Sequence, residues 1–389
     1  MEFAALNGGD TTFGVTEEQL IMRTSVLALL ERALPAAKIA ELDESRAFPF
    51  EAYRALAEAG WMGLPYPSEL GGLGGTFKDL TIFIEAVSYH NAQMASAYLT
   101  TVIYGGMQIR HSANHDLRHQ IMPEIVSGQK KLAFCMTEPG TGSDVSAVST
   151  RAVVDGGDFI VNGQKTYITC AHVADYLVVV VKTRADAGHK GLSLLLVDRE
   201  SAGVTIRPLR ALGRRMIHTN EVFFDSVRVP RTRLLSELDG GWANIMRGLS
   251  IERLCLSAAA SGNCRRIIAT AASFARDREQ FGRRITEYQA ISHKLADMRI
   301  LAETAQVLSY RVAEMLDAGL NPVTETAIAK VVATENNFRC ADMGMQIMGG
   351  AGYMMDSEMQ MYLRDSRVGP IGGGTSEIMR NVIARQMLA

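Results

Sequence analysis

The sequence lacks the features that mark exported, metal-bound or nucleic-acid-binding proteins. Its five cysteines include no CxxC pair, which excludes a disulfide framework and a zinc knuckle. The 40 basic and 42 acidic side chains nearly cancel, so neither a DNA-tracking face nor a polybasic membrane anchor is indicated. No window contains the roughly 20 apolar residues of a membrane-spanning helix, and the N-terminus has no basic segment followed by an apolar run. We therefore expect a cytoplasmic protein that binds neither nucleic acid nor membrane.

Common short motifs for nucleotides, hydrolysis and metals are also missing. No GxGxxG follows a strand and opens a helix, so a Rossmann nicotinamide site is unsupported. GxSxG is absent, and Ser143 has no evident histidine partner nearby. His111, His115 and His119 would share a face of one continuous helix, but Ser112-Ala113-Asn114 predicts a turn between them. No metal site is therefore predicted.

The chain has helical periodicity at both ends and strand patterns between them. At 389 residues and 47% hydrophobic composition, it is long enough for two or three packed units. Thr16 and Gln19 match a capping box at the start of the first helix, and six β-branched runs separated by turns occupy the centre of the chain. The pattern predicts an α+β fold with a helical domain at 1–131, a β barrel or sandwich at 132–238, and a second helical domain at 239–389.

Three long segments resemble one known family. They are AFCMTEPGTGSDVSAVSTRA from Ala133, SFARDREQFGRRITEYQAISHKLADM from Ser273, and QIMGGAGYMMDSEMQMYLRDSRVGPIGGGTSEIMRNVIARQML from Gln346. These segments, in this order, resemble the signature stretches of acyl-CoA dehydrogenases, and the resemblance covers essentially the whole chain. It implies a C-terminal four-helix bundle and an FAD-dependent enzyme that oxidises an acyl-CoA. It also implies a homotetramer that passes electrons to an electron-transfer flavoprotein.

The resemblance assigns the flavin to residues from all three segments. Extended segments can offer backbone amides to the edge of an isoalloxazine ring, and the planar fork of Arg278 suits a diphosphate of a neighbouring subunit. Tyr167 and Cys170 depart from the Trp and Asn common in relatives. The predicted cofactor-binding residues are Phe134, Met136, Thr137, Gly142, Ser143, Tyr167, Ile168, Thr169, Arg278, Gln280, Phe281, Gln289, Gln346, Gly349, Gly350, Thr375 and Glu377.

The predicted catalytic base occupies a different position in this sequence from that in many relatives. They carry a Glu immediately before the final Gly-Thr, where this chain has Gly373. A subset that includes the isovaleryl and long-chain types places the Glu on a C-terminal helix just before an Arg, and Glu252 precedes Arg253 in the same way. We therefore expect Glu252 to remove the α proton and the Gly373 amide to hold the thioester carbonyl. The small and apolar neighbours of Glu252 predict partial desolvation and a pKa above about 4.3.

The substrate is less well specified than the reaction. Gly372 replaces a bulky aromatic of many relatives, which predicts room for branched or bulky acyl groups, whereas Ser250 departs from the Asp of isovaleryl-type enzymes. Two alternatives stay open: a dehydrogenase of an acyl group on a carrier protein, and a non-catalytic acyl-CoA-binding subunit. The predicted substrate-binding residues are Ser96, Leu99, Thr100, Ile103, Ser143, Leu249, Arg253 and Gly372.

Overall fold

The computed structural model describes residues 14–388, which fall into two compact units. We call residues up to 41, 76–95 and 253 onward the helical unit, and residues 42–75 and 96–252 the sheet unit. Residues 1–13, which include most of the N-terminus predicted to lack an export signal, lie outside the described residues. Within residues 14–388, none of the helices is long and apolar enough to cross a membrane.

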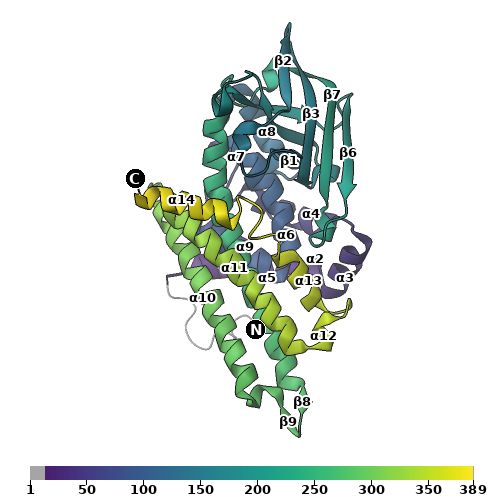
Figure 1. The fold of residues 1–389 in the computed structure, drawn as a ribbon, viewed down its shortest axis with the longest axis vertical. Helices are drawn as coiled ribbons and strands as arrows, with labels where there is room; N and C mark the ends of the chain where they lie inside the picture. The colour runs from purple at the N-terminus through teal and green to yellow at the C-terminus, as the bar shows by residue number, and fades with distance from the viewer. Residues whose placement is uncertain (1–13, 389) are drawn as a thin grey trace. The chain divides into compact units, whose positions relative to one another are not determined.

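The helical unit is built from long helices and one short hairpin (Figure 1). Its elements are α2 (Glu17–Ala33), α5 (Phe77–His90), β8 (Glu279–Gln280), β9 (Arg283–Arg284), α10 (Gln289–Asp317), α11 (Val323–Met348), α12 (Gly350–Tyr353), α13 (Glu358–Ser366) and α14 (Ser376–Leu388). Three further helices have residues in both units: α3 (Ala36–Ser45), α6 (Ala92–Leu99) and α9 (Gly241–Asp277). The capping box predicted for α2 is confirmed, because Thr16 and Gln19 exchange hydrogen bonds of 3.1 and 3.3 Å.

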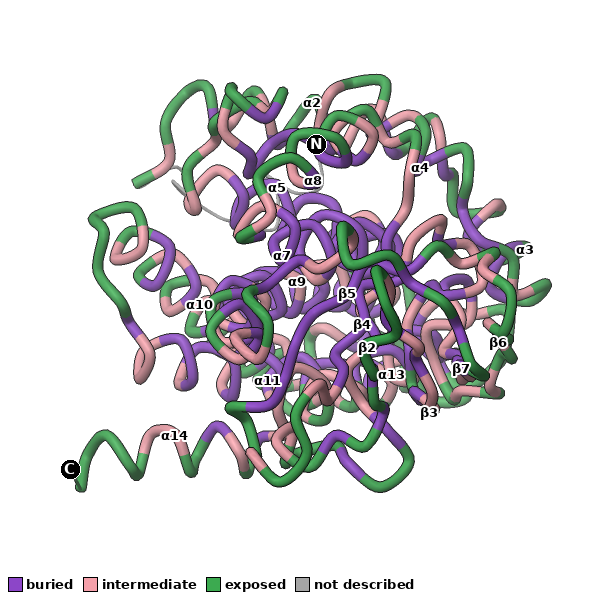
Figure 2. Tube along the Cα trace, turned by 90° about the horizontal axis from the view of Figure 1, so that it is seen from above, coloured by how far each residue is buried: buried purple, intermediate pink, exposed green. Residues whose placement is uncertain are grey.

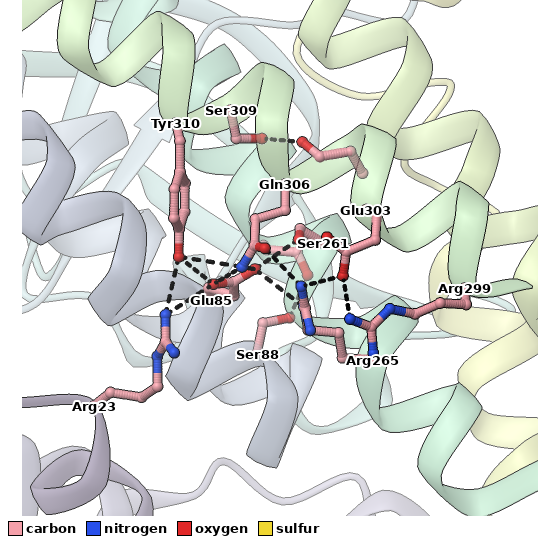
Figure 3. Close-up of polar contacts among 12 residues, drawn as sticks. Arg23, Glu85, Ser88, Ser261, Arg265, Arg299, Glu303, Gln306, Ser309 and Tyr310 are labelled. Carbon is pink, nitrogen blue, oxygen red and sulfur yellow. Dashed lines mark hydrogen bonds and ion pairs between the residues drawn. The ribbon is translucent and has the colours of Figure 1, made fainter. Parts of the chain in front are cut away.

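A buried carboxylate joins four helices of the helical unit (Figure 3). Glu85 on α5 is 1% exposed and lies 3.6 Å from Arg23 on α2 and 3.7 Å from Arg265 on α9. Its oxygens also accept hydrogen bonds of 2.7 to 2.9 Å from the side chains of Ser261, Gln306 and Tyr310. A buried charge is tolerated when it is paired and hydrogen-bonded. This cluster therefore fixes α2, α5, α9 and α10 against one another.

The sheet unit is built on one seven-stranded sheet. Its strands are β1 (Leu132–Cys135), β2 (Arg151–Asp155), β3 (Asp158–Thr169), β4 (Tyr176–Lys182), β5 (Leu192–Asp198), β6 (Val204–Leu209) and β7 (Thr219–Pro230). The strand order is β1-β4-β2-β3-β7-β6, with β5 antiparallel to β4 and β1 parallel to it. All six strands expected from the β-branched runs are present, and β1 adds a seventh. The predicted α+β fold, with β structure between helical regions, is confirmed.

The centre of the sheet is covered on both faces. Strands β4 and β5 are buried along almost their whole length (Figure 2), as their near-continuous apolar sequences YLVVVVK and LSLLLVD require. Strand β3 instead alternates, with Phe159 and Val161 in the core. By the same alternation, Lys165 also faces inward and is fully buried. The core of the sheet therefore contains a charge.

Helical segments also belong to the sheet unit. They are α4 (Phe50–Glu58), a π-helical turn (Thr100–Gly105), α7 (Gly106–Arg110) and α8 (His115–Val126). The expected break between the three histidines is present, because α7 ends at Arg110 and the Asn114 side chain caps α8. His111 is held in this break by a 2.8 Å hydrogen bond to the Met107 carbonyl. The histidines therefore do not form a single ligand face.

The Glu85 cluster predicts a large stability effect of one substitution. Glu85→Gln keeps the side-chain volume but removes the buried carboxylate that lies beside the Arg23 and Arg265 guanidinium groups, of which Arg265 keeps its ion pair with Glu303. We expect the free energy of unfolding, measured by urea denaturation, to fall by about 3 to 5 kcal/mol. Glu41→Gln, which breaks the exposed pair with Lys38, is the control and should change it by less than about 1 kcal/mol. Equal effects of the two substitutions would contradict the role assigned to the cluster.

Candidate functional site

Two stretches of the sheet unit that were predicted to line the flavin lie side by side. The Thr166 amide donates a 2.9 Å hydrogen bond to the Thr137 carbonyl, which joins the residues after β1 to β3. Between Lys165 and Ile168 the pairing of β3 with β7 shifts its register. Tyr167 in this irregularity has φ 59° and is 67% exposed. A left-handed conformation is uncommon for an aromatic residue, and such bulges often re-aim a side chain beside a site.

Backbone donors along the first stretch are available to a ligand. Phe134, Met136 and Thr137 are half-buried. The amides of Met136 and Thr137 donate no hydrogen bond to any residue that the structure describes. Unpaired donors of this kind fit the edge of a flavin ring, which presents carbonyl oxygens and ring nitrogens. Gly142 and Ser143 follow on an exposed loop.

A fully buried ion pair supports this stretch from beneath. The Lys165 ammonium lies 2.8 Å from Oε1 of Glu138 and donates a 3.1 Å hydrogen bond to the Met136 carbonyl. The two side chains are 0% and 3% exposed. Glu138 also accepts hydrogen bonds of 2.6 to 2.9 Å from the Ser149 amide and hydroxyl and from the Thr150 amide. The pair therefore ties Met136 and its neighbours to β3.

The environment of this pair shifts both pKa values. Burial lowers the pKa of Lys165 to about 8. Burial alone would raise the pKa of Glu138, but Lys165 and the hydrogen bonds from Ser149 and Thr150 together lower it to about 2. Both groups are therefore charged at neutral pH.

Four of the predicted substrate-binding residues lie on α6 and the π-helical turn. These four are buried: Ser96, Leu99, Thr100 and Ile103. Thr101 Oγ1 accepts a 3.2 Å hydrogen bond from the Leu132 amide, so the turn packs against β1. A Cβ at Gly105 would lie 2.6 Å from the Leu132 Cβ, which shows how close the two backbones are. π-Helical turns are rare and frequently occur at functional sites.

Helix α9 carries the predicted base. Glu252 is half-buried among buried apolar neighbours that include Leu249 and Leu254. One turn earlier, a Cβ at Gly248 would lie 2.0 Å from Nε2 of Gln108, so α9 and α7 are in close contact there. Glu252 and the π-helical turn both belong to the sheet unit.

Two cationic side chains hold the turn that precedes α14. In the helical unit, Arg253 Nε donates a 3.2 Å hydrogen bond to the Gly373 carbonyl, and the buried Lys330 ammonium donates one of 2.6 Å to the Gly374 carbonyl. Gly373 and Gly374 have φ 67° and 91°, a region that favours glycine. The half-buried Gly373 amide donates to no residue in the described part of the chain. The turn thus presents a fixed and available donor at Gly373, whose role in holding a thioester stays a prediction.

The remaining predicted cofactor residues of the helical unit lie at helix ends and on the hairpin. Thr375 Oγ1 accepts a hydrogen bond from the Ile378 amide at the start of α14. Glu377 is exposed nearby, and a backbone hydrogen bond together with the Thr375 hydroxyl lowers its pKa. Phe281 is 95% exposed at the hairpin tip with φ 53°. Exposed positions are shared by Arg278, Gln280, Gln289, Gln346, Gly349 and Gly350.

Sequence reasoning missed the supporting charges. Glu138 lies within the first segment that resembles the family, but neither its pairing nor Lys165 is part of the sequence prediction. The alternation of β3 does mark Lys165 as buried, because Lys165 lies on the same inward-facing side of the strand as Phe159 and Val161. No comparable signal marks Lys330, one of many polar residues on a long helix.

Comparisons with known proteins extend over the whole of this framework. Residues 16–129, 133–227 and 239–388 match the N-terminal, middle and C-terminal domains of acyl-CoA dehydrogenases. Benzylmalonyl-CoA dehydrogenase of Aromatoleum aromaticum is 35% identical over 96% of this chain and 99% of that protein. The caffeyl-CoA reductase-Etf complex subunit CarC of Acetobacterium woodii is 33% identical over 96% and 99%. The crystal structure of the prolyl acyl carrier protein oxidase AnaB superposes with a TM-score of 0.92 at 25% identity, covering 96% of this chain and 99% of that one.

The buried pair beneath the first stretch predicts a non-additive stability effect. Lys165→Met leaves the Glu138 carboxylate buried without its cation, and we expect the free energy of unfolding to fall by about 3 to 5 kcal/mol in urea denaturation. Adding Glu138→Gln removes the stranded charge and should recover part of the loss. Strict additivity of the two substitutions would show that the groups are not coupled.

The pH dependence gives a second measurement on the same pair. The pKa of Glu138 in the folded protein, about 2, lies below its ordinary value of 4.5. Its contribution to stability is therefore complete above pH 4.5 and is lost as the pH falls toward 2. The difference in unfolding free energy between the parent and Glu138→Gln should accordingly shrink from about pH 6 to about pH 3. A difference that does not change with pH would exclude an ionised Glu138.

Proposed function

The chain belongs to the acyl-CoA dehydrogenase family, and we propose that it introduces an α,β double bond into an acyl-CoA thioester with Glu252 as the base. Members of this family are oxidoreductases that act on acyl-CoA, and this chain is one of them. In the proposed reaction the α proton passes to the Glu252 carboxylate and the β hydrogen leaves as hydride. The electron pair of the broken α C–H bond forms the new double bond.

One observation carries this proposal. Arg253, the residue directly after Glu252 on α9, holds the Gly373 carbonyl through its Nε at 3.2 Å. The candidate base is therefore next in the chain to the side chain that fixes the candidate oxyanion donor. With its carbonyl held in this way, the Gly373 amide supplies a preorganised hydrogen bond for a thioester oxygen that gains charge as the α proton leaves. Such donors are often worth about 3 to 4 kcal/mol of barrier.

FAD is the cofactor that suits the residues present. When bound, FAD supplies the hydride acceptor. The free amides of Met136 and Thr137 would hold the ring edge, and Tyr167, turned outward by the β3 irregularity, would cover one face. Arg278, close to the exposed hairpin, would hold the diphosphate of a neighbouring subunit, because its fork can bind two oxygens at once. The exposed Phe281 at the hairpin tip supports an oligomer, which we propose to be a cytoplasmic tetramer.

The acyl group is proposed to be bulky or branched. A Cβ at Gly372 would meet no atom closer than the Val368 carbonyl oxygen at 3.7 Å, so the position leaves space that an aromatic side chain would fill. The similarity to a benzylmalonyl-CoA dehydrogenase supports a large substrate. The similarity to a subunit of a caffeyl-CoA reductase-Etf complex supports an electron-transfer flavoprotein as the electron acceptor.

A carrier-protein thioester is the second candidate substrate. The prolyl acyl carrier protein oxidase AnaB shares the whole fold at 25% identity, and the same base chemistry would serve either thioester. Reduction of the bound flavin by a panel of CoA and carrier-protein thioesters separates the two. A protein that binds acyl-CoA without any flavin reduction would instead be the non-catalytic subunit.

The base assignment predicts the effect of one isosteric substitution. Glu252→Gln keeps size and hydrogen bonding but cannot accept a proton. Stopped-flow flavin reduction by a substrate thioester should slow by about 100- to 10,000-fold, with thioester affinity changed by less than about threefold, since binding does not need the proton transfer. Glu237→Gln, an exposed position just before α9, is the control and should react at the parent rate. Reduction of Glu252→Gln at the parent rate would exclude Glu252 as the base.

The space at Gly372 predicts a change in selectivity. Gly372→Tyr should fold, because no close contact opposes a side chain there. We expect kcat/KM for a branched or aromatic acyl-CoA, relative to a short straight-chain one, to fall by about tenfold or more. Gly372→Ala is the size control and should change this ratio much less. An unchanged ratio in Gly372→Tyr would place the acyl group elsewhere.

A further inference from the structure

A cationic cavity lies in the sheet unit. It has a volume of about 190 Å³ and is formed by the loop after α3 and the segment that joins β6 to β7. Its lining residues are Arg46, Pro208, Leu209, Arg210, Ala211, Arg214, Arg215, His218 and Thr219. Four of these nine residues are arginines, and no carboxylate is among them. The wall therefore combines permanent positive charge with an exposed lining that is mostly apolar.

One carboxylate approaches this wall. The buried Asp43 forms an ion pair with Arg215, with an oxygen 3.8 Å from Nη1. Arg215 also has a buried donor, Nε, that finds no acceptor among the described residues. Four lining arginines against this one carboxylate leave a surplus of positive charge around the cavity. The arrangement therefore favours a negatively charged occupant.

The backbone around the cavity is held in an unfavourable conformation. Arg46, Arg214 and His218 have φ 56°, 54° and 37°, in the left-handed region that side chains other than glycine rarely adopt. The His218 ring joins the two walls, because its Nε2 donates a 2.5 Å hydrogen bond to the Arg46 carbonyl. The face of the His218 ring is covered by the stacked His172 ring, with the ring centroids 4.2 Å apart. Strain concentrated in this way is typical of ligand clamps.

We propose that this cavity is a binding site for a phosphate group, either as the free anion or at the end of a small metabolite. Guanidinium forks match the tetrahedral oxygens of phosphate and can bind two of them at once. The volume accommodates such a group. This site is separate from the proposed catalytic residues, and its occupancy does not depend on the proposed dehydrogenase activity.

The test measures phosphate binding to the flavin-loaded, full-length protein by calorimetry in phosphate-free buffer. Arg214→Gly removes one guanidinium and places glycine at a left-handed position, so the variant should have a thermal midpoint no lower than that of the parent. It should bind inorganic phosphate at least about tenfold more weakly. Arg207→Ala is the matched control, because Arg207 lies on β6 against the Phe223 ring and does not line the cavity. Its affinity should stay within about twofold of the parent value, as for a charge outside the site.

Further ligands separate the two sources of the phosphate group. Tight binding of inorganic phosphate alone indicates a free-anion site, whereas tighter binding of AMP with no binding of adenosine indicates the phosphate of a metabolite. Either result supports the proposal. Equal phosphate affinity in the parent and Arg214→Gly would overturn it, as would the absence of phosphate and AMP binding. Competition by acetate as strong as that by sulfate would overturn it too, because a carboxylate would then serve equally well.

Discussion

The sheet half of the proposed site depends on one buried interaction, the ion pair between Lys165 and Glu138. A buried lysine ammonium is unfavourable unless it is paired and hydrogen-bonded, and here two of its three hydrogens are directed at the Glu138 carboxylate and the Met136 carbonyl. Met136 and Thr137 follow the short strand β1 and are not part of a regular series of strand-to-strand hydrogen bonds. The ion pair holds these residues in place, while their amides have no hydrogen-bond partner among the described residues.

Buried charges play the same part in the helical unit. Arg265, in the Glu85 cluster, lies on the same helix as Glu252 and Arg253. Fixing α9 through Arg265 therefore also fixes the axial position of the residues that precede it on that helix, since an α-helix is stiff over a few turns. Lys330 and Arg253 then restrain two consecutive carbonyls of the glycine turn. Each of these charges therefore has a direct partner among the described residues.

The elements could be predicted from the sequence, but the side-chain pairs could not. The helical spacing of apolar residues and the capping box predict α2, and the apolar runs predict that β4 and β5 are buried on both faces. These features can be predicted because they depend on residues that are close in the sequence. Lys165 and Glu138 are 27 positions apart, and Arg253 and Gly373 are 120 apart. Such pairs result from tertiary packing. The π-helical turn is hidden for the same reason: the Tyr66 hydroxyl bonds the Val102 carbonyl at 2.5 Å, and TTVIYG alone reads as ordinary helix.

The backbone at Gly373 gives a physical reason for the position of the proposed base. With φ 67°, this residue is in the left-handed region, where a glutamate would add strain of order 1 to 3 kcal/mol. A glutamate at 252 has no such penalty, because it lies within the regular helix α9 and glutamate is a good helix former. Moving the carboxylate to the helix leaves a glycine whose amide can serve the thioester oxygen and whose carbonyl can be held by Arg253. Base and oxyanion donor are then provided by separate elements, so each can be positioned without compromising the other.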